Sequence, residues 1–183
     1  LMSNANDTRA RAARLRLMAF DVDGVMTDGG LTYADDGSES KTFNVRDGLG
    51  LKLLQDAGIE VAVITGRQSP CVAARMDNLG IAHLQQGIGD KLASMQALLD
   101  RLGIAAEEAG YMGDDLIDLR VMAACGFSAT PSDGHRLARQ HARFVCSQSG
   151  GHGAVREVCE FILAAQGKLD AALAPYLPAL PPR

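Results

Sequence analysis

The chain has 183 residues, of which 47% are hydrophobic and 4% aromatic, and its 18 basic and 22 acidic side chains give a formal net charge of −4. This length fits one ordinary domain with short appendages, and a composition rich in small and aliphatic residues favours an α/β fold over an aromatic-rich sandwich. The acidic balance makes a nucleic-acid partner unexpected, and no stretch approaches the roughly 18 apolar residues of a membrane span.

Residues 1–14 are predicted to be a basic leader. The segment has no continuous apolar run before the first acid of the domain, so it does not have the pattern of a signal peptide. The four cysteines of the chain are scattered and contain no C-x-x-C pair. This usage is typical of reduced thiols, and we expect a cytoplasmic protein.

Residues 15–168 are predicted to form one domain of alternating strands and helices. Short apolar strands are expected from Leu15 and at 60–64, 81–85, 109–112, 126–129 and 143–146. The helices between them are expected to end at Gly58, Gly80 and Gly103, where the chain must turn left-handed. Strands that alternate with helices predict right-handed crossovers and a doubly wound, Rossmann-like parallel sheet.

One segment, at about 29–45, breaks this rhythm and predicts a protruding β-hairpin. Leu31 and Tyr33 alternate on one expected strand, Phe43 and Val45 on the other, around the turn at Asp36-Gly37. Because an isolated hairpin is marginally stable in water, we expect it to pack on another subunit, although folding back on its own domain is the alternative. Residues 169–183 form a proline-containing tail whose last ten residues are expected to be mobile.

Polar side chains follow four of the predicted strands. The carboxyl ends of parallel strands share one edge of a sheet, where ligands bind, so we expect these side chains to lie together. The residues concerned are Asp21 and Asp23, Thr65 with Gly66 and Arg67, Lys91 with Gly87 and Gly89 just before it in the chain, and Asp114 with Asp115.

This set of groups predicts phosphate-ester chemistry with Mg²⁺. Three nearby carboxylates need a cation, and Mg²⁺ prefers oxygen ligands and shares its coordination shell with phosphates. Asp21 is then a candidate nucleophile, and Asp23, on the same side of an extended backbone, is a candidate acid and base. Thr65 and the Gly66 backbone can donate hydrogen bonds to phosphate oxygens, and Lys91 adds positive charge.

Each of these features has an ordinary structural explanation when it is taken alone. A D-x-D-G stretch is common in turns, the acids of 113–118 favour the start of a helix, and Lys91 can be a solvated helix residue. Asp118 is expected to be mainly structural. The order of the features at successive strand ends is what favours catalysis.

The motifs DVDG, ITG, Lys91 and GDD resemble those of the haloacid dehalogenase superfamily of phosphotransferases over residues 15 to about 130. The second acid of DVDG argues against the dehalogenase branch itself. Over nearly the whole chain, the stretches DVDGVMTDGGLTY, FNVRDGLG, ITGR, GDDLIDLRVM and GGHGAVREVCEFILAAQGKLD are similar to 3-deoxy-D-manno-octulosonate 8-phosphate phosphatases. That resemblance implies a fold without a cap domain, a homotetramer assembled through the hairpins, and a role in making the inner-core sugar of lipopolysaccharide.

The resemblance also implies roles for single residues. Mg²⁺ would be held by the side chains of Asp21 and Asp114 and by the backbone carbonyl of Asp23. Thr65 and Lys91 would bind the phosphoryl group. The candidates for binding the sugar acid are Arg67, Arg46 and the adjacent Asp47, for which a structural ion pair is the alternative. His152 stands where some family members carry Arg, which weakens the case for a permanent charge there.

Three other functions stay open on the sequence. A phosphatase of a nine-carbon, sialic-acid-type sugar 9-phosphate would share nearly all the motifs. A phospho-receiver domain also combines acids, Thr and Lys around Mg²⁺. In a receiver, however, the phosphorylated Asp ends a middle strand and the acid pair precedes it, whereas here one Asp pair comes first and another acid pair comes last. The third possibility is an oligomeric scaffold without activity, which the presence of every motif residue disfavours.

Overall fold

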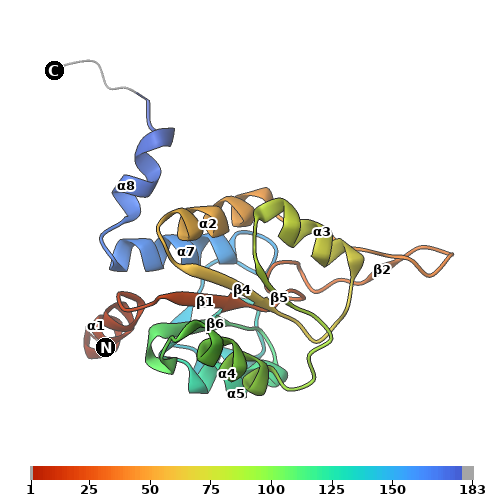
Figure 1. Cartoon of the computed structure of the whole chain (residues 1–183), viewed down its shortest axis with the longest axis horizontal. Coiled ribbons are helices and arrows are strands. Elements are labelled where there is room, and N and C mark those ends of the chain that lie inside the picture. The colour runs from red at the N-terminus through yellow and green to blue at the C-terminus, as the bar shows by residue number, and fades with distance from the viewer. Residues whose placement is uncertain (1, 179–183) are drawn as a thin grey trace.

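Six parallel strands form the sheet at the centre of the protein (Figure 1), and the computed structural model describes residues 2–178. The strands are β1 (Leu17–Phe20), β4 (Glu60–Ile64), β5 (His83–Gln85), β6 (Ala109–Met112), β7 (Phe127–Thr130) and β8 (Phe144–Val145). Their spatial order is β5-β4-β1-β6-β7-β8. The chain therefore builds outward from β1 on one side and then returns to build on the other, so that a switch point lies beside β1.

Helices cover both faces of this sheet, as the doubly wound prediction requires. One face carries α2 (Val45–Asp56), α3 (Pro70–Leu79) and α7 (Ala154–Ala165), and the other carries α4 (Lys91–Leu102) and α5 (Leu119–Ala124) (Figure 1). A short helix, α6 (Arg136–His141), precedes β8, and single 3-10 turns occur at Ala106–Glu108 and Leu116–Asp118. The predicted fold class is confirmed.

The core consists of two apolar clusters, one on each face of the sheet. Side chains alternate along β1, so that Met18 and Phe20 join the cluster under α2 and α7 while Leu17 and Ala19 join the cluster under α4 and α5. All four are fully buried. This two-sided burial explains why the strand sequences are continuous apolar runs.

The predicted element boundaries agree closely with the structure. The strands at 60–64 and 109–112 are confirmed to the residue. Gly58, Gly80 and Gly103 have φ of 81°, 69° and 63°, so the left-handed turns after the helices are also confirmed.

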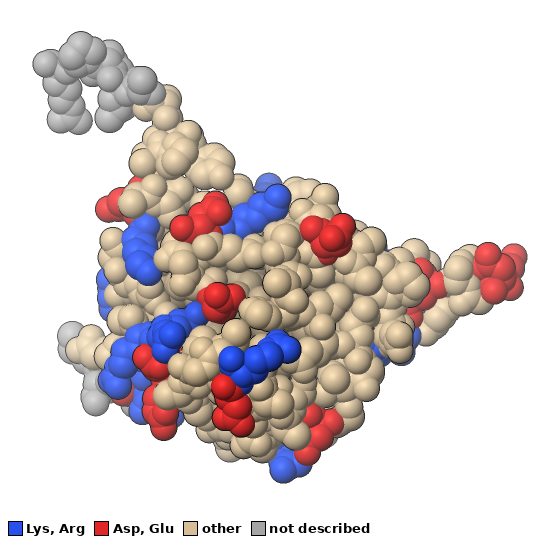
Figure 2. All heavy atoms as spheres, viewed as in Figure 1, with Lys and Arg blue, Asp and Glu red and all other residues tan. Residues whose placement is uncertain are grey.

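The hairpin is formed by β2 (Thr32–Tyr33) and β3 (Glu39–Ser40), which pair in antiparallel fashion. Figure 1 shows it extending away from the central sheet, and Figure 2 shows acidic residues at its far end, where Asp35 and Asp36 are exposed. The prediction that Phe43 and Val45 lie on its second strand is wrong.

Helix α2 explains this error. The Asn44 side chain accepts a hydrogen bond from Arg46 N at 2.8 Å and so caps the helix, which begins at Val45. The alternation of Phe43 and Val45 is thus the approach to a helix.

Both ends of the chain are helical where the structure describes them. Helix α1 (Met2–Ala12) occupies most of the predicted leader and packs against α7, and Ala12 is fully buried. The tail contains α8 (Leu169–Leu173) and a 3-10 turn at Ala174–Tyr176, while residues 179–183 of the segment predicted to be mobile lie outside the described residues. Within residues 2–178, no helix has both the length and the apolar character needed to cross a membrane.

Candidate active site

An open cleft of about 260 Å³ lies at the carboxyl ends of the central strands. Two of its sides come from the loop after β1 and the loop after β4, and a third comes from the loop after β6. It is lined by Asp21, Asp23, Gly24, Gly29, Thr65, Gly66, Arg67, Asp114, Asp115 and Ile117. The structure therefore brings together the polar groups that the sequence places at successive strand ends.

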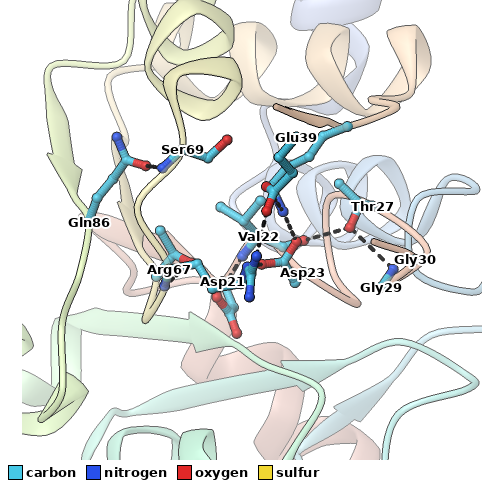
Figure 3. Close-up of polar contacts among 12 residues, drawn as sticks. Asp21, Val22, Asp23, Thr27, Gly29, Gly30, Glu39, Arg67, Ser69 and Gln86 are labelled. Atoms are coloured by element: carbon cyan, nitrogen blue, oxygen red, sulfur yellow. Dashed lines mark hydrogen bonds and ion pairs between the residues drawn. The ribbon is translucent and has the colours of Figure 1, made fainter. Parts of the chain in front are cut away.

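Asp21 lies at the floor of this cleft and is held at both carboxylate oxygens. Its Oδ1 accepts a hydrogen bond from Val22 N at 2.7 Å (Figure 3). Its Oδ2 accepts one from Lys91 Nζ at 2.6 Å. The residue is only 5% exposed. A buried carboxylate with both oxygens oriented is suited to attack a substrate in one direction.

Lys91 is itself buried, with a side chain that is 3% exposed, and it connects two acids. Its Nζ contacts Asp21 Oδ2 at 2.6 Å and Asp118 Oδ1 at 2.7 Å. Burial alone would lower the pKa of this ammonium group, but the two carboxylates outweigh that effect and raise it. Lys91 therefore remains charged next to Asp21, although it does not itself line the cleft.

Asp118 has a larger part in the site than the sequence suggested. It is fully buried, and Tyr111 Oη donates to its Oδ1 at 3.2 Å, while the backbone N–H groups of Asp114 and Asp115 donate to its Oδ2 at 3.1 and 3.2 Å. The residue thus fixes both Lys91 and the loop that carries Asp114. Its position five residues after Gly113, at the end of a 3-10 turn, gives no sequence signal that separates it from an ordinary surface acid.

Crowding of the acids changes their titration. Burial and then the charge of Asp118 raise the pKa of Asp21 to about 6. Burial, Asp118 and Asp21 raise the pKa of Asp114 to about 7. A cation bound beside these two carboxyl groups would therefore stabilise their ionised forms strongly.

The geometry fits a divalent cation at the mouth of this acid cluster. Carboxylate oxygens of Asp21, Asp114 and Asp118 lie within 4.8 Å of one another. Each oxygen of Asp118 already accepts two hydrogen bonds, whereas each oxygen of Asp21 accepts one, and Asp118 does not line the cleft. The side chains available to a hard cation are therefore those of Asp21 and Asp114, as the resemblance implied.

Thr65, Gly66 and Arg67 form the wall opposite Asp114. Thr65 is 2% exposed, and its Oγ1 accepts a hydrogen bond from Arg67 N at 3.4 Å. The Arg67 guanidinium reaches across the cleft, where its Nε lies 3.7 Å from Asp23 Oδ2. The wall therefore combines hydroxyl and backbone donors with one positive charge.

The hairpin contributes polar residues that the sequence did not assign to the site. Glu39 pairs with Arg67 and contacts Lys41 at 3.0 Å, while Lys41 also pairs with Asp23, and Figure 3 shows the Glu39 side chain pointing toward Asp23 and Arg67. Hydrogen bonds from Arg67 and then Lys41 lower the pKa of Glu39 to about 2. The local sequence pattern does not indicate these contacts, because Lys41 follows the two-residue strand β3 and its partners depend on how the hairpin folds over the domain.

Arg46, Asp47 and His152 lie outside the cleft within one chain. Arg46 and His152 line a separate cavity of about 420 Å³ beside the start of α7. Asp47 is buried, and its Oδ1 accepts a hydrogen bond from Arg156 N at 2.9 Å, so it fastens α2 to the first turn of α7. Substrate contact by Arg46 stays a prediction, and the geometry of Asp47 is that of a structural cap.

Gly24 provides a test of the cation site. Its φ is +82°, and a Cβ placed on it would lie 2.1 Å from Asp114 Oδ2. Gly24→Ala should displace this carboxylate and weaken Mg²⁺ binding by about tenfold or more, as losses around metal ligands do. Isothermal titration calorimetry measures this, with Gly37→Ala, also at positive φ but with open space around its Cβ, as the matched control. Equal affinities for the two variants would contradict the assignment.

The raised pKa values predict a pH-dependent affinity for Mg²⁺. Asp114 and Asp21 hold protons below about 7 and about 6, and these protons must leave before the carboxylates can bind a cation. Affinity should fall as pH decreases through this window and level off above it. Calorimetry in buffers of different ionisation enthalpy should also detect proton release near pH 6, and an affinity that is constant across the window would refute the prediction.

No family model matches the chain. Individual relatives do match it. The chain is 48% identical over 166 residues to 3-deoxy-D-manno-octulosonate 8-phosphate phosphatase KdsC of Escherichia coli, and the alignment covers 91% of this chain and 88% of that protein. It is also 48% identical over 168 residues to the protein of the same name from Yersinia pestis, with coverage of 92% and 90%.

Solved structures agree with this relationship. The crystal structure of the phosphatase of the same name from Moraxella catarrhalis, in complex with magnesium, phosphate and the sugar acid, has a TM-score of 0.92 at 42% identity and covers 94% of this chain and 99% of that one. A cobalt-bound relative from Haemophilus influenzae has a TM-score of 0.85 at 42% identity, with coverage of 88% and 94%. The chain therefore belongs to the 3-deoxy-D-manno-octulosonate 8-phosphate phosphatase family of the haloacid dehalogenase superfamily, and it is a phosphoric monoester hydrolase.

Proposed function

We propose that the protein hydrolyses 3-deoxy-D-manno-octulosonate 8-phosphate to the free sugar acid and inorganic phosphate, through a covalent phosphate on Asp21, in the synthesis of the lipopolysaccharide inner-core sugar. The observation that carries this proposal is the single cleft in which Asp21, Asp23 and Asp114 face Thr65 and Arg67. Relatives at 48% identity bear the name of this activity, and the Moraxella catarrhalis relative was solved with the sugar acid bound.

The first half of the reaction needs a nucleophile and a proton donor. An Asp21 oxygen attacks phosphorus, forming an acyl phosphate, while the bond from phosphorus to the C8 oxygen of the sugar breaks. Asp23, which borders the same cleft, gives its proton to that oxygen. Lys91, at 2.6 Å from Asp21 Oδ2, stabilises the attacking group and the negative charge on the phosphoryl oxygens.

The second half regenerates the enzyme. Asp23, now ionised, takes a proton from water as the water oxygen attacks phosphorus, and the bond to Asp21 breaks to release phosphate. Mg²⁺, held by Asp21, Asp114 and the carbonyl of Asp23, would neutralise the phosphoryl charge. Thr65 Oγ1 and the backbone of Gly66 would orient the phosphoryl oxygens, and Arg67 suits a carboxylate because its guanidinium can bind it in bidentate fashion.

The reaction can be tested by phosphate release with Mg²⁺ on four substrates. These are 3-deoxy-D-manno-octulosonate 8-phosphate, a sialic acid 9-phosphate, a hexose 6-phosphate and p-nitrophenyl phosphate. We expect the eight-carbon acid to have the highest kcat/KM, and Asp21→Asn to lower its turnover by about 10⁴-fold or more while the protein stays folded. A preference for the nine-carbon acid would reject the proposed substrate, and near wild-type turnover by Asp21→Asn would reject the covalent mechanism.

We also propose that the protein is a homotetramer assembled through the hairpin. Leu31 and Tyr33 are 48% and 56% exposed, which is unusual for two large apolar side chains on one short strand and its approach. Burial of this surface in a partner would stabilise a hairpin that has only two paired residues on each strand.

Leu31→Glu should therefore shift the protein to smaller species in sedimentation velocity, because it places a charge in the proposed contact. Val145→Glu on β8, where the apolar side chain is 44% exposed, is the matched control and should leave the assembly intact. A Leu31→Glu protein that sediments like the wild type would argue against the hairpin contact.

A further inference from the structure

Four charged side chains form a closed ring beside the cleft, which we call the four-charge ring: Asp23, Lys41, Glu39 and Arg67. Positive and negative charges alternate around it. Lys41 contacts both Asp23 and Glu39, and Arg67 contacts both Glu39 and Asp23. The ring joins the loop after β1, the loop after β4 and the end of the hairpin, where Glu39 lies on β3 and Lys41 directly follows it.

Lys41 differs from the other three members of the ring in its position. Its side chain is 1% exposed, whereas those of Glu39, Asp23 and Arg67 are 13%, 21% and 42% exposed. Asp23 and Arg67 line the cleft, and Lys41 does not belong to the residues that line it. The ammonium group therefore contacts Asp23 from a buried position that does not line the cleft.

The contact gives the two carboxylate oxygens of Asp23 different surroundings. Lys41 Nζ donates to Oδ1, while Oδ2 lies 3.7 Å from Arg67 Nε, which is beyond hydrogen-bond distance. The side chain of Asp23 is thus anchored at one oxygen, and the other is left to exchange a proton in the cleft. Orientation of this kind lowers the entropy that the reacting group must lose in the transition state.

The segment that carries Lys41, directly after β3, is held in place by its own chain. The Cys71 thiol at the start of α3 donates a hydrogen bond to the Glu39 carbonyl at 3.2 Å, and Arg67 donates one to Tyr33 Oη at 2.8 Å. Both contacts fix the base of the hairpin against the domain. Lys41 is therefore placed by the fold of one chain and needs no partner to reach Asp23.

We propose that Lys41 is a positioning residue that orients Asp23 for proton transfer to the leaving oxygen. This inference rests on the acid and base role proposed above for Asp23. When the bond from phosphorus to the sugar oxygen breaks, the proton passes from Asp23 to that oxygen, and Lys41 neither gains nor loses a proton. The alternative is that Lys41 only attaches the hairpin to the domain.

The nature of the leaving group distinguishes these two roles. A sugar alkoxide is strongly basic and needs a proton as it leaves, whereas p-nitrophenolate is stabilised by its ring and leaves without one. The ratio kcat/KM covers the steps up to departure of this group. A defect in proton donation therefore lowers kcat/KM for the sugar phosphate only, whereas a general disturbance of the fold or of the cation site lowers it for both.

Lys41→Met should lower kcat/KM for 3-deoxy-D-manno-octulosonate 8-phosphate by about 30-fold or more, within the contribution of general acid catalysis, and change that for p-nitrophenyl phosphate by less than about threefold. Lys52→Met, on an exposed position of α2, is the matched control and should change neither. The double variant Lys41→Met with Asp23→Asn should lose no more kcat/KM for the sugar phosphate than Asp23→Asn alone, because Lys41 acts through Asp23.

Removal of a buried ammonium group can impair folding, so a second variant is included. Lys41→Met with Glu39→Gln removes one positive and one negative charge and keeps the ring neutral, and we expect the same loss that is specific for the sugar phosphate. Equal losses on both substrates in these variants would overturn the inference while leaving the role of Asp23 intact. If Asp23→Asn itself lowers kcat/KM equally for both substrates, the proposed role of Asp23 is rejected, and the inference is rejected with it.

Discussion

The ion pairs of the Lys91 ammonium group are the interactions on which the rest of the site depends. Two acids, Asp21 and Asp118, are buried at the end of a parallel sheet, and burying an unpaired ion costs several kcal/mol. Lys91 lies between them and contacts both. Asp118 also accepts a hydrogen bond from the backbone of Asp114, so one buried cation organises both the proposed nucleophile and the loop of the proposed second metal ligand.

The position of β1 at the middle of the sheet makes this arrangement possible. The loops after β4 and β6, on either side of β1, converge on the acids that follow it. Glycine is needed where this convergence is tightest. The Asp114 carboxylate occupies the space beside Gly24 in which any other residue would have a side chain, so the D-x-D-G motif provides both the acids and the room for a third one.

Much of this could be predicted from the sequence because it depends on local pattern. Apolar runs bounded by glycine predicted β4 and β6 to the residue, and the order of polar groups at strand ends predicted the cleft. The second hairpin strand could not be predicted well, because two alternating apolar residues before an Asn cap look alike in a strand and in the approach to a helix. The contacts of Lys41 depend on how the hairpin folds over the domain, which local pattern does not specify.

The hairpin has an exposed outer surface and a base that charge pairs attach to the domain. Its outer surface carries Leu31 and the acidic tip, whereas its base carries Glu39 and Lys41, which hold Arg67 and Asp23. A two-stranded hairpin has little intrinsic stability, so the charge pairs at its base stabilise it. The hairpin in turn positions the charged side chains. Lys41 at this base contacts Asp23, so a change in the shape of the hairpin base reaches the side chain of Asp23 directly. The shape of the hairpin and the chemistry of the cleft are thus coupled through the four-charge ring.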